Sequence, residues 1–154
     1  MIRISITDQT LSHRLPTGVW HHYPISSASK GCGNQQGSWQ TPLGKHRIHQ
    51  KIGQGEPTHT FFRARKAMGI YQVGSDDPTC DWILTRILWL EGVQTGINKR
   101  GKVDTRSRYI YIHGTHEEHR IGEPASHGCI RMRNRDLIQL FDDCQLHESV
   151  NIHL

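Results

Sequence analysis

The sequence predicts a mostly β domain that carries one clear helix near its C-terminal end. Segments in which apolar and polar residues alternate, or in which β-branched and aromatic residues dominate, recur along the first two thirds of the chain. The 154 residues include 15 glycines and 6 prolines, which is typical of a turn-rich β chain and unlike a helical bundle. We expect one domain, 1–154, because no repeat, linker or change of composition divides the chain.

The first strand is expected at the start of the sequence, where Ile2, Ile4 and Ile6 alternate with polar residues. Pro24 has no N–H to donate, so its strand should lie at a sheet edge or have Pro24 near its end. Residues 82–90 fit a strand or a helix by pattern, and their β-branched and aromatic content favours a strand. Further strands are expected at 11–15, 19–26, 45–52 and 68–73, with loops or turns at 27–39, 41–44 and 53–57.

The last third of the chain should contain a loop, two strands and the helix. Residues 94–108 predict an exposed basic loop, and the Tyr-Ile-Tyr-Ile run at 109–112 has the strongest strand pattern in the sequence. The helix should begin near Asn134, a good N-cap residue, with Asp136 in its first turn, and a strand at 150–153 closes the chain. The apolar face of the helix would consist of Leu137, Leu140 and Phe141.

The charge of the chain is positive, with 19 Lys and Arg against 14 Asp and Glu, a net +5 and a pI near 9.2. Such a balance suits nucleic acid, an acidic small substrate or a wall polymer. The basic residues are dispersed, without the interleaved aromatic residues of a nucleic-acid motif, so we expect no nucleic-acid partner. Nothing in the sequence indicates an oligomeric state.

No apolar stretch approaches the length of a membrane span, since Arg86 and Glu91 interrupt the longest candidate at 82–93. Residues 1–7 have the pattern of a strand and not of a signal peptide. We therefore expect a cytoplasmic protein if Met1 is the native start, and a periplasmic one if a leader has been removed. The four cysteines are expected to be reduced, because a domain of this size needs no disulfide.

The chemistry-bearing part of the sequence lies between two histidine-containing motifs at 112–115 and 126–132. A thiol with a pKa of about 8.5 is mostly neutral at pH 7, and a neighbouring imidazole can take its proton or hold it as an imidazolium–thiolate pair. His113 follows a predicted strand that would aim it as a base. Cys129 lies in a turn where Gly128 lets consecutive N–H groups converge on an oxyanion. Arg131 could bind a substrate carboxylate or hold the loop.

A metal site is the alternative, because His113, His116 and His119 lie near His127 and Cys129 in sequence. The two histidines of His-Glu-Glu-His are one residue too close for the zinc-binding spacing on a helix, and Gly114 also argues against a helix here. We expect no functional metal, with His116 and His119 in a solvated loop.

The segments His-Gly-Thr at 113–115 and Ser-His-Gly-Cys-Ile-Arg-Met at 126–132 resemble the catalytic signature of the L,D-transpeptidase catalytic domain family, also called the YkuD domain. The resemblance covers essentially the whole chain. It extends to segments 23–26, 37–38, 41–44, 134–141 and 150–153.

The resemblance implies a mostly β, sandwich-like fold with one or two short helices and a cysteine-bearing loop before the C-terminal helix. Cys129 would be the nucleophile, His113 its base, and the carbonyl of Gly114 the group that orients His113. Backbone N–H groups around His127, Gly128 and Cys129 would form the oxyanion hole. Ser126, His127 and Arg131 would shape the substrate site, and no metal or organic cofactor is implied.

The family chemistry implied is acyl transfer on peptidoglycan tetrapeptide stems or muropeptides, through a thioester on Cys129 that releases the terminal D-Ala. Hydrolysis of that thioester would make the protein an L,D-carboxypeptidase in muropeptide recycling, which is the expectation for a cytoplasmic chain. Transfer to a second stem would make it a cross-linking transpeptidase, and a catalytically silent wall-peptide binding module is a third alternative. Acylation of Cys129 by a carbapenem is also implied.

Two departures from the family pattern bear on the substrate. Many family members carry Asn where this chain has Arg131, two residues after the cysteine. Residues 53–66 and 94–108 match nothing general to the family, so we expect these segments to influence substrate choice.

Overall fold

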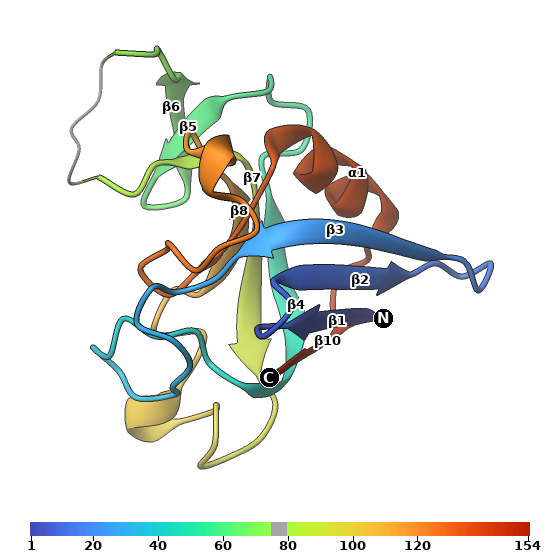
Figure 1. Ribbon diagram of the computed structural model, residues 1–154, viewed down its shortest axis with the longest axis vertical. Helices are drawn as coiled ribbons and strands as arrows, with labels where there is room; N and C mark the ends of the chain where they lie inside the picture. Colours follow the sequence, from blue (N-terminus) through green and yellow to red (C-terminus); the bar gives the residue numbers. More distant parts are fainter. Residues whose placement is uncertain (75–79) are drawn as a thin grey trace.

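Within residues 1–74 and 80–154, which the structure describes, the computed structural model contains ten strands, one α-helix and two 3-10 turns (Figure 1). The strands are β1 (Ile2–Ser5), β2 (Thr10–Arg14), β3 (Trp20–Ser26), β4 (Gly44–Ile52), β5 (Thr60–Arg63), β6 (Lys66–Ile70), β7 (Ile83–Gly92), β8 (Tyr111–Gly114), β9 (Ile130–Met132) and β10 (Ser149–His153). The helical elements are α1 (Asn134–Asp143) and the 3-10 turns η1 (Gly101–Val103) and η2 (Glu118–Arg120).

The strands form one sheet that closes on itself. Its order is β4-β10-β1-β2-β3-β9-β8-β7-β5-β6, and β4 also pairs with β7. Because β4 is hydrogen-bonded to β10 on one side and to β7 on the other, the sheet encloses its apolar side chains, and only the β5–β6 hairpin projects from it beside β7. The predicted mostly β fold with a C-terminal helix is confirmed, and its strands belong to one closed sheet.

The core lies between the inner faces of the strands and α1, which packs on β7 and β8. The helix contributes the three apolar residues that its sequence pattern predicts, all fully buried: Leu137, Leu140 and Phe141. At its C-terminal end, Lys51 Nζ donates hydrogen bonds to the carbonyls of Phe141 (2.5 Å) and Cys144 (2.7 Å). A cation there satisfies carbonyls that the helix leaves without partners.

The strands expected in the first half of the chain and at 82–90 are confirmed, with boundaries that shift by one or two residues. Pro24 lies opposite Thr10 of β2, whereas β9 pairs with β3 only at Ile25 and Ser26. The proline therefore occupies a stretch of β3 that has a partner on one side only, near the strand end, as its missing N–H requires.

Two strand predictions need correction. The run at 109–112 does not begin a strand at Tyr109, which lies in a turn with a φ of 56° and is half exposed; β8 begins at Tyr111. The sequence interpretation also missed β5, and the strand expected at 68–73 begins earlier, at Lys66, as the second arm of the β5–β6 hairpin. Every residue of β6 is exposed, so no apolar alternation marks it.

Asn134 is not the N-cap of α1, contrary to the sequence interpretation. Arg133 takes that position, and Asn134 is the first helical residue and is buried. Its side-chain amide donates to the carbonyl of Thr115 (2.9 Å) and to Glu118 Oε1 (2.7 Å), and its carbonyl accepts from Thr85 Oγ1 (2.6 Å). A polar side chain that is buried among three partners is held by tertiary contacts, which local sequence cannot show.

The segment 94–108 is not simply an exposed basic loop. It contains η1, and two of its polar residues, Asn98 and Thr105, are fully buried. Asn98 donates to the carbonyls of Leu43 (3.2 Å) and Lys45 (2.9 Å), and Thr105 is hydrogen-bonded to His46 Nε2 (3.0 Å). These contacts fasten the segment to the start of β4, while its lysines and most of its arginines remain at the surface.

Across the described residues, no helix has both the length and the apolar character to cross a membrane. The four cysteines, Cys32, Cys80, Cys129 and Cys144, are free thiols.

Candidate active site

The parallel pair β8 and β9 positions the predicted base and the segment that follows the predicted nucleophile. Ile112 lies opposite Ile130 in this pair, and His113 lies opposite Arg131. The two isoleucines point into the core, so alternation along the strands directs His113 and Arg131 to the other face of the sheet. Cys129 immediately precedes β9 and shares that face, two positions from Arg131.

His113 is held as a neutral imidazole. Its Nδ1 lies 2.7 Å from the carbonyl oxygen of Gly114, which can only accept, so Nδ1 carries the proton and Nε2 is left with a free lone pair. Burial lowers the pKa of His113; the Asp81 carboxylate and the hydrogen bond to Gly114 act against this, and Arg131 adds to it. The ring is therefore poised to accept a proton at Nε2, which is the form that a general base requires.

Position 114 requires glycine, because the surrounding atoms leave no room for a side chain. A Cβ atom there would lie 2.2 Å from Asn134 Oδ1 and 2.7 Å from the carbonyl oxygen of Leu84. The close packing fixes the carbonyl that orients His113, as the sequence resemblance implies.

Cys129 is half-buried, and its thiol interacts with the backbone at the start of β8. The N–H of Tyr111 donates to Sγ (3.4 Å), and Sγ lies 3.5 Å from the carbonyl oxygen of Tyr109. Burial raises the pKa of the Cys129 thiol to about 12, with Asp81 adding to the effect and the Tyr111 N–H and Arg131 opposing it. Within the described residues no hydrogen bond joins His113 to Cys129, and the pKa shifts favour the neutral form of each.

Of the two charge states that the sequence left open, the structure favours the neutral pair over the imidazolium–thiolate pair. The same burial disfavours both charged partners, since it raises the thiol pKa and lowers the imidazole pKa. Hydrogen bonds between catalytic partners commonly tighten only when substrate is bound, so the absence of one here is compatible with an acid–base pair.

The cysteine loop is braced by two hydroxyls. Ser126 Oγ donates to the carbonyl of Cys129 (2.5 Å) and accepts from the N–H of Gly128 (3.2 Å), and Thr41 Oγ1 donates to the carbonyl of Gly128 (3.0 Å). Of the three N–H groups predicted to form the oxyanion hole, that of Gly128 already donates to Ser126 Oγ. In the described part of the chain, the N–H groups of His127 and Cys129 have no protein acceptor, so these two are free to bind an oxyanion.

Arg131 is buried and its charge is already balanced. Nη2 lies 2.7 Å from Asp81 Oδ1, and Nη1 lies 2.8 Å from Glu117 Oε2. Of the two roles considered from the sequence, these contacts fit the one in which Arg131 holds the loops around the site. The side chain of His127, in contrast, is 54% exposed and meets the ring of Trp39 edge-on at 5.8 Å.

Two cavities are lined by residues near Cys129 in the sequence or in contact with it. One of about 460 Å³ is lined by His127, Arg131 and Asp81 together with the loop that follows β8. Another of about 490 Å³ is lined by Trp89, Tyr109 and the segment 94–108. Of the histidines weighed as metal ligands, His116, His119 and His127 line the first of these cavities; His119 is exposed and the ring of His116 lies 5.5 Å from that of Tyr71. No group of three metal-ligating side chains occurs among residues 1–74 and 80–154.

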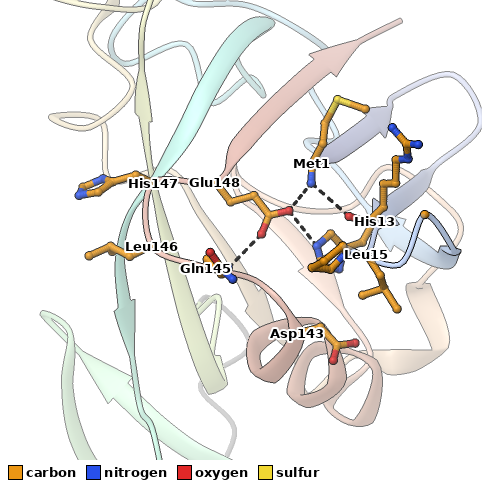
Figure 2. A pocket seen from close by; sticks show the side chains of 11 residues that line it. Met1, His13, Leu15, Asp143, Gln145, Leu146, His147 and Glu148 are labelled. Atoms are coloured by element: carbon orange, nitrogen blue, oxygen red, sulfur yellow. Dashed lines mark hydrogen bonds and ion pairs between the residues drawn. The ribbon is translucent and has the colours of Figure 1, made fainter.

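A cavity of about 550 Å³ near the start of the chain lies away from this chemistry (Figure 2). One of its two carboxylates, Glu148, accepts hydrogen bonds from the amino group of Met1, from His13 Nε2 (2.9 Å) and from the N–H of Gln145 (2.9 Å). Burial acts to raise the pKa of Glu148, but these three hydrogen bonds outweigh it and leave the pKa lowered. Glu148 thus has three donors within the structure, which fits a structural role.

Sequence reasoning missed the partners that complete the site. Asp81 and Glu117 balance Arg131, and Thr41 supports the cysteine loop, yet each lies outside the motif segments at 112–115 and 126–132. Tyr111 could have been found, because it alternates with His113 on the same strand.

The chain matches the sequence model of the L,D-transpeptidase catalytic domain over residues 1–152. Its fold is similar to an L,D-transpeptidase from Mycobacterium smegmatis (TM-score 0.57, 15% identity), with 99% of this chain and 58% of that one covered. It is also similar to L,D-transpeptidase 3 from Mycobacterium tuberculosis bound to a faropenem-derived adduct (TM-score 0.59, 17% identity, 99% and 59% covered). A third similar structure is an Enterococcus faecium L,D-transpeptidase with a Cys-to-Ser substitution (TM-score 0.59, 13% identity, 99% and 48% covered).

The chain thus spans between about half and three fifths of the length of these solved proteins. A search of curated protein sequences found no match. The family match over nearly all residues, together with the shared fold, shows that this chain belongs to the L,D-transpeptidase catalytic domain (YkuD) family.

Proposed function

We propose that this domain catalyses acyl transfer on peptidoglycan tetrapeptide stems, with Cys129 as nucleophile and His113 as general base. The observation that carries the proposal is the state of His113: its Nδ1–H is committed to the Gly114 carbonyl, so Nε2 is free to take a proton on the sheet face that Cys129 shares. Family membership supplies the substrate class.

The proposed acylation proceeds in two proton transfers. Cys129 Sγ attacks the carbonyl carbon of the third stem residue while its proton passes to His113 Nε2. The tetrahedral oxyanion accepts hydrogen bonds from the N–H groups of His127 and Cys129. The C–N bond then breaks, His113 returns the proton to the departing amine of D-Ala, and a thioester remains on Cys129.

The thioester can be resolved by two acceptors. Water attack yields a tripeptide and regenerates the thiol, whereas the amine of a second stem yields a cross-link. We propose hydrolysis, an L,D-carboxypeptidase activity on muropeptides in the cytoplasm, because it requires no second stem at the site. Cross-linking in the periplasm is the competing proposal, and cell fractionation of the native protein separates the two locations.

The experiment is mass spectrometry of the protein incubated with a disaccharide-tetrapeptide. Loss of D-Ala without dimers is expected, and dimers joined through third residues would replace hydrolysis by transpeptidation. Cys129→Ala should give no product, while Cys144→Ser, which alters a buried cysteine outside the site, serves as the matched control. If the unaltered protein forms neither product, a wall-peptide binding module becomes the better interpretation.

A carbapenem provides an independent test of the nucleophile. The proposal expects one covalent adduct on Cys129, detected as a mass increase that is absent in Cys129→Ala. An adduct on another cysteine would contradict the assignment.

A further inference from the structure

The two segments that match nothing general to the family, 53–66 and 94–108, meet beside the nucleophile. Arg65 comes from the first segment, Arg106 from the second, and both stack on Trp89 of β7, with Cζ-to-centroid distances of 4.9 and 5.8 Å. Tyr109 also stacks on Trp89, at 5.8 Å, and Tyr111 meets it edge-on at 6.0 Å. We call these five residues the aromatic–arginine cluster.

Arg65 contacts all three aromatic residues of the aromatic–arginine cluster. Its guanidinium lies 4.9 Å from the ring of Trp89 and 5.0 Å from the ring of Tyr109, and Nη1 donates to the phenol oxygen of Tyr111 (3.2 Å). Stacking on rings orients a guanidinium while leaving its N–H edge available. Among the described residues no carboxylate pairs with Arg65, so most of its donors remain unused.

Tyr111 connects the guanidinium of Arg65 to the sulfur of Cys129, because it contacts both. Its backbone N–H donates to Cys129 Sγ (3.4 Å), and its phenol oxygen accepts from Arg65. The guanidinium therefore lies one tyrosine side chain away from the thiol. A substrate group that binds Arg65 while Cys129 attacks must therefore lie several bonds from the scissile carbonyl carbon. The terminal carboxylate of D-Ala is only three bonds from that carbon, which is too close.

The backbone that carries Arg65 and Tyr109 has positive φ angles at residues other than glycine. Ala64 and Arg65 form the turn of the β5–β6 hairpin with φ values of 46° and 66°, and Tyr109 has a φ of 56°. Gly, Asn and Asp are the residues that favour this region, and other residues pay on the order of 1 kcal/mol or more. The cost is compensated by contacts that place Arg65 and Tyr109 face to face.

The carboxylates on this side of the molecule are already in use. In the cavity of about 490 Å³, Glu91 is paired with Arg47 (2.6 Å), and Asp104 accepts from the N–H groups of Arg100 (2.7 Å) and Ser107 (2.9 Å). Because these carboxylates already have partners, the charged groups left to bind a ligand at the cluster are the guanidinium groups. A planar carboxylate matches the N–H fork of a guanidinium better than other anionic groups of a peptide.

We propose that Arg65, within the aromatic–arginine cluster, binds a carboxylate at the end of the side chain of the third stem residue and so selects acyl donors that carry one. This inference rests on the proposed acyl transfer at Cys129 and deepens it by naming the donor. Arg65 is a specificity-determining residue, and the cluster is the subsite for the donor side chain.

The test compares two tetrapeptides that differ in one group. One carries 2,6-diaminopimelate at the third position, and the other carries lysine, which is the same side chain without the distal carboxylate. A charge-assisted hydrogen bond predicts that kcat/KM for release of D-Ala favours the first by about tenfold or more. In Arg65→Met the ratio should fall towards one, and Arg65→Lys should keep part of it. Arg63→Met, an exposed neighbour on the same hairpin, should leave the ratio unchanged.

The outcomes separate this inference from the proposed function. Release of D-Ala at equal rates from both peptides, with no change of the ratio in Arg65→Met, would overturn the subsite and leave the acyl transfer intact. Equal losses for both peptides in Arg65→Met would place the bound carboxylate elsewhere on the donor and also overturn it. No release from either peptide by the unaltered protein would contradict the proposed function itself. Thermal unfolding of each variant verifies that it is folded.

Discussion

His113 and Arg131 lie directly opposite each other in the parallel register of β8 and β9. The candidate base therefore has a buried guanidinium as its neighbour, and the charge of that guanidinium is balanced by Asp81 and Glu117. Arg131 lowers the pKa of His113 and Asp81 raises it, so the two partly cancel and burial dominates. Burial and the adjacent guanidinium both favour the neutral form of His113, and the Asp81 carboxylate opposes them.

Arg131→Met should disturb both stability and the pH profile. Removal of one partner from a buried ion group leaves Asp81 and Glu117 uncompensated, which costs about 3–5 kcal/mol in the free energy of unfolding. With the guanidinium gone and Asp81 retained, the pKa of His113 rises, and the acid limb of kcat/KM moves to higher pH. Urea unfolding and a pH–rate profile measure the two effects. Arg133→Met, at an exposed position nearby, should change neither.

The neutral thiol predicts slow alkylation and no thiolate at neutral pH. Because burial raises the pKa of Cys129 to about 12, a Cys32→Ser/Cys80→Ser/Cys144→Ser variant should show no thiolate absorbance near 240 nm between pH 6 and 9. The lowered pKa of His113 keeps the base neutral, so activity should be half-maximal below pH 6.5 on the acid side. A thiolate signal that persists to pH 6 would instead demonstrate an imidazolium–thiolate pair.

Gly114→Ala should impair the site without touching a reacting side chain. The new methyl would meet Asn134 Oδ1 and the Leu84 carbonyl at distances that no Cβ tolerates, so the backbone must shift and carry with it the carbonyl that orients His113. A misaligned base costs about tenfold to a hundredfold in kcat. Gly33→Ala is the control, because only the flexible side chain of Gln40 stands in its way. Unchanged turnover in Gly114→Ala would contradict the orienting role.

His46 should make the fold sensitive to acid. It is buried between the carbonyl of Gly44 (2.9 Å) and Thr105 Oγ1 (3.0 Å), and burial lowers its pKa to about 4. As the pH falls, His46 is protonated in the unfolded chain before it is protonated in the folded one. The free energy of unfolding should therefore be highest above pH 6.5 and fall by about 3 kcal/mol towards pH 4.

The measurement is the free energy of unfolding from urea titrations at a series of pH values. His46→Asn should remove much of the slope between pH 6.5 and 4, whereas the exposed His153→Asn should retain it. An unchanged slope in His46→Asn would assign the acid sensitivity to other groups.

Much of the fold was predictable because its signals are local. The alternation of Ile2 and Ile4 marks β1, and the spacing of Leu137, Leu140 and Phe141 marks the apolar face of α1. The hairpin arm β6 was placed imprecisely because all of its residues are exposed and carry no alternation. The sequence predicts Asn134 as an N-cap because Asn is a common cap residue. Its actual hydrogen-bond partners, Thr115 and Thr85, come from other elements and leave no local signal.

The sequence by itself determined the family, the strand-rich class and the candidate pair Cys129 and His113, because residue types and spacing within short motifs encode them. The pKa shifts of that pair depend on the folded chain, since burial comes from the packing of the whole sheet. The same holds for the salt bridge of Arg131 with Asp81, fifty positions earlier, and for the stacking of Arg65 on Trp89. Pairings between distant strands bring such residues together, and no local pattern along the chain records them.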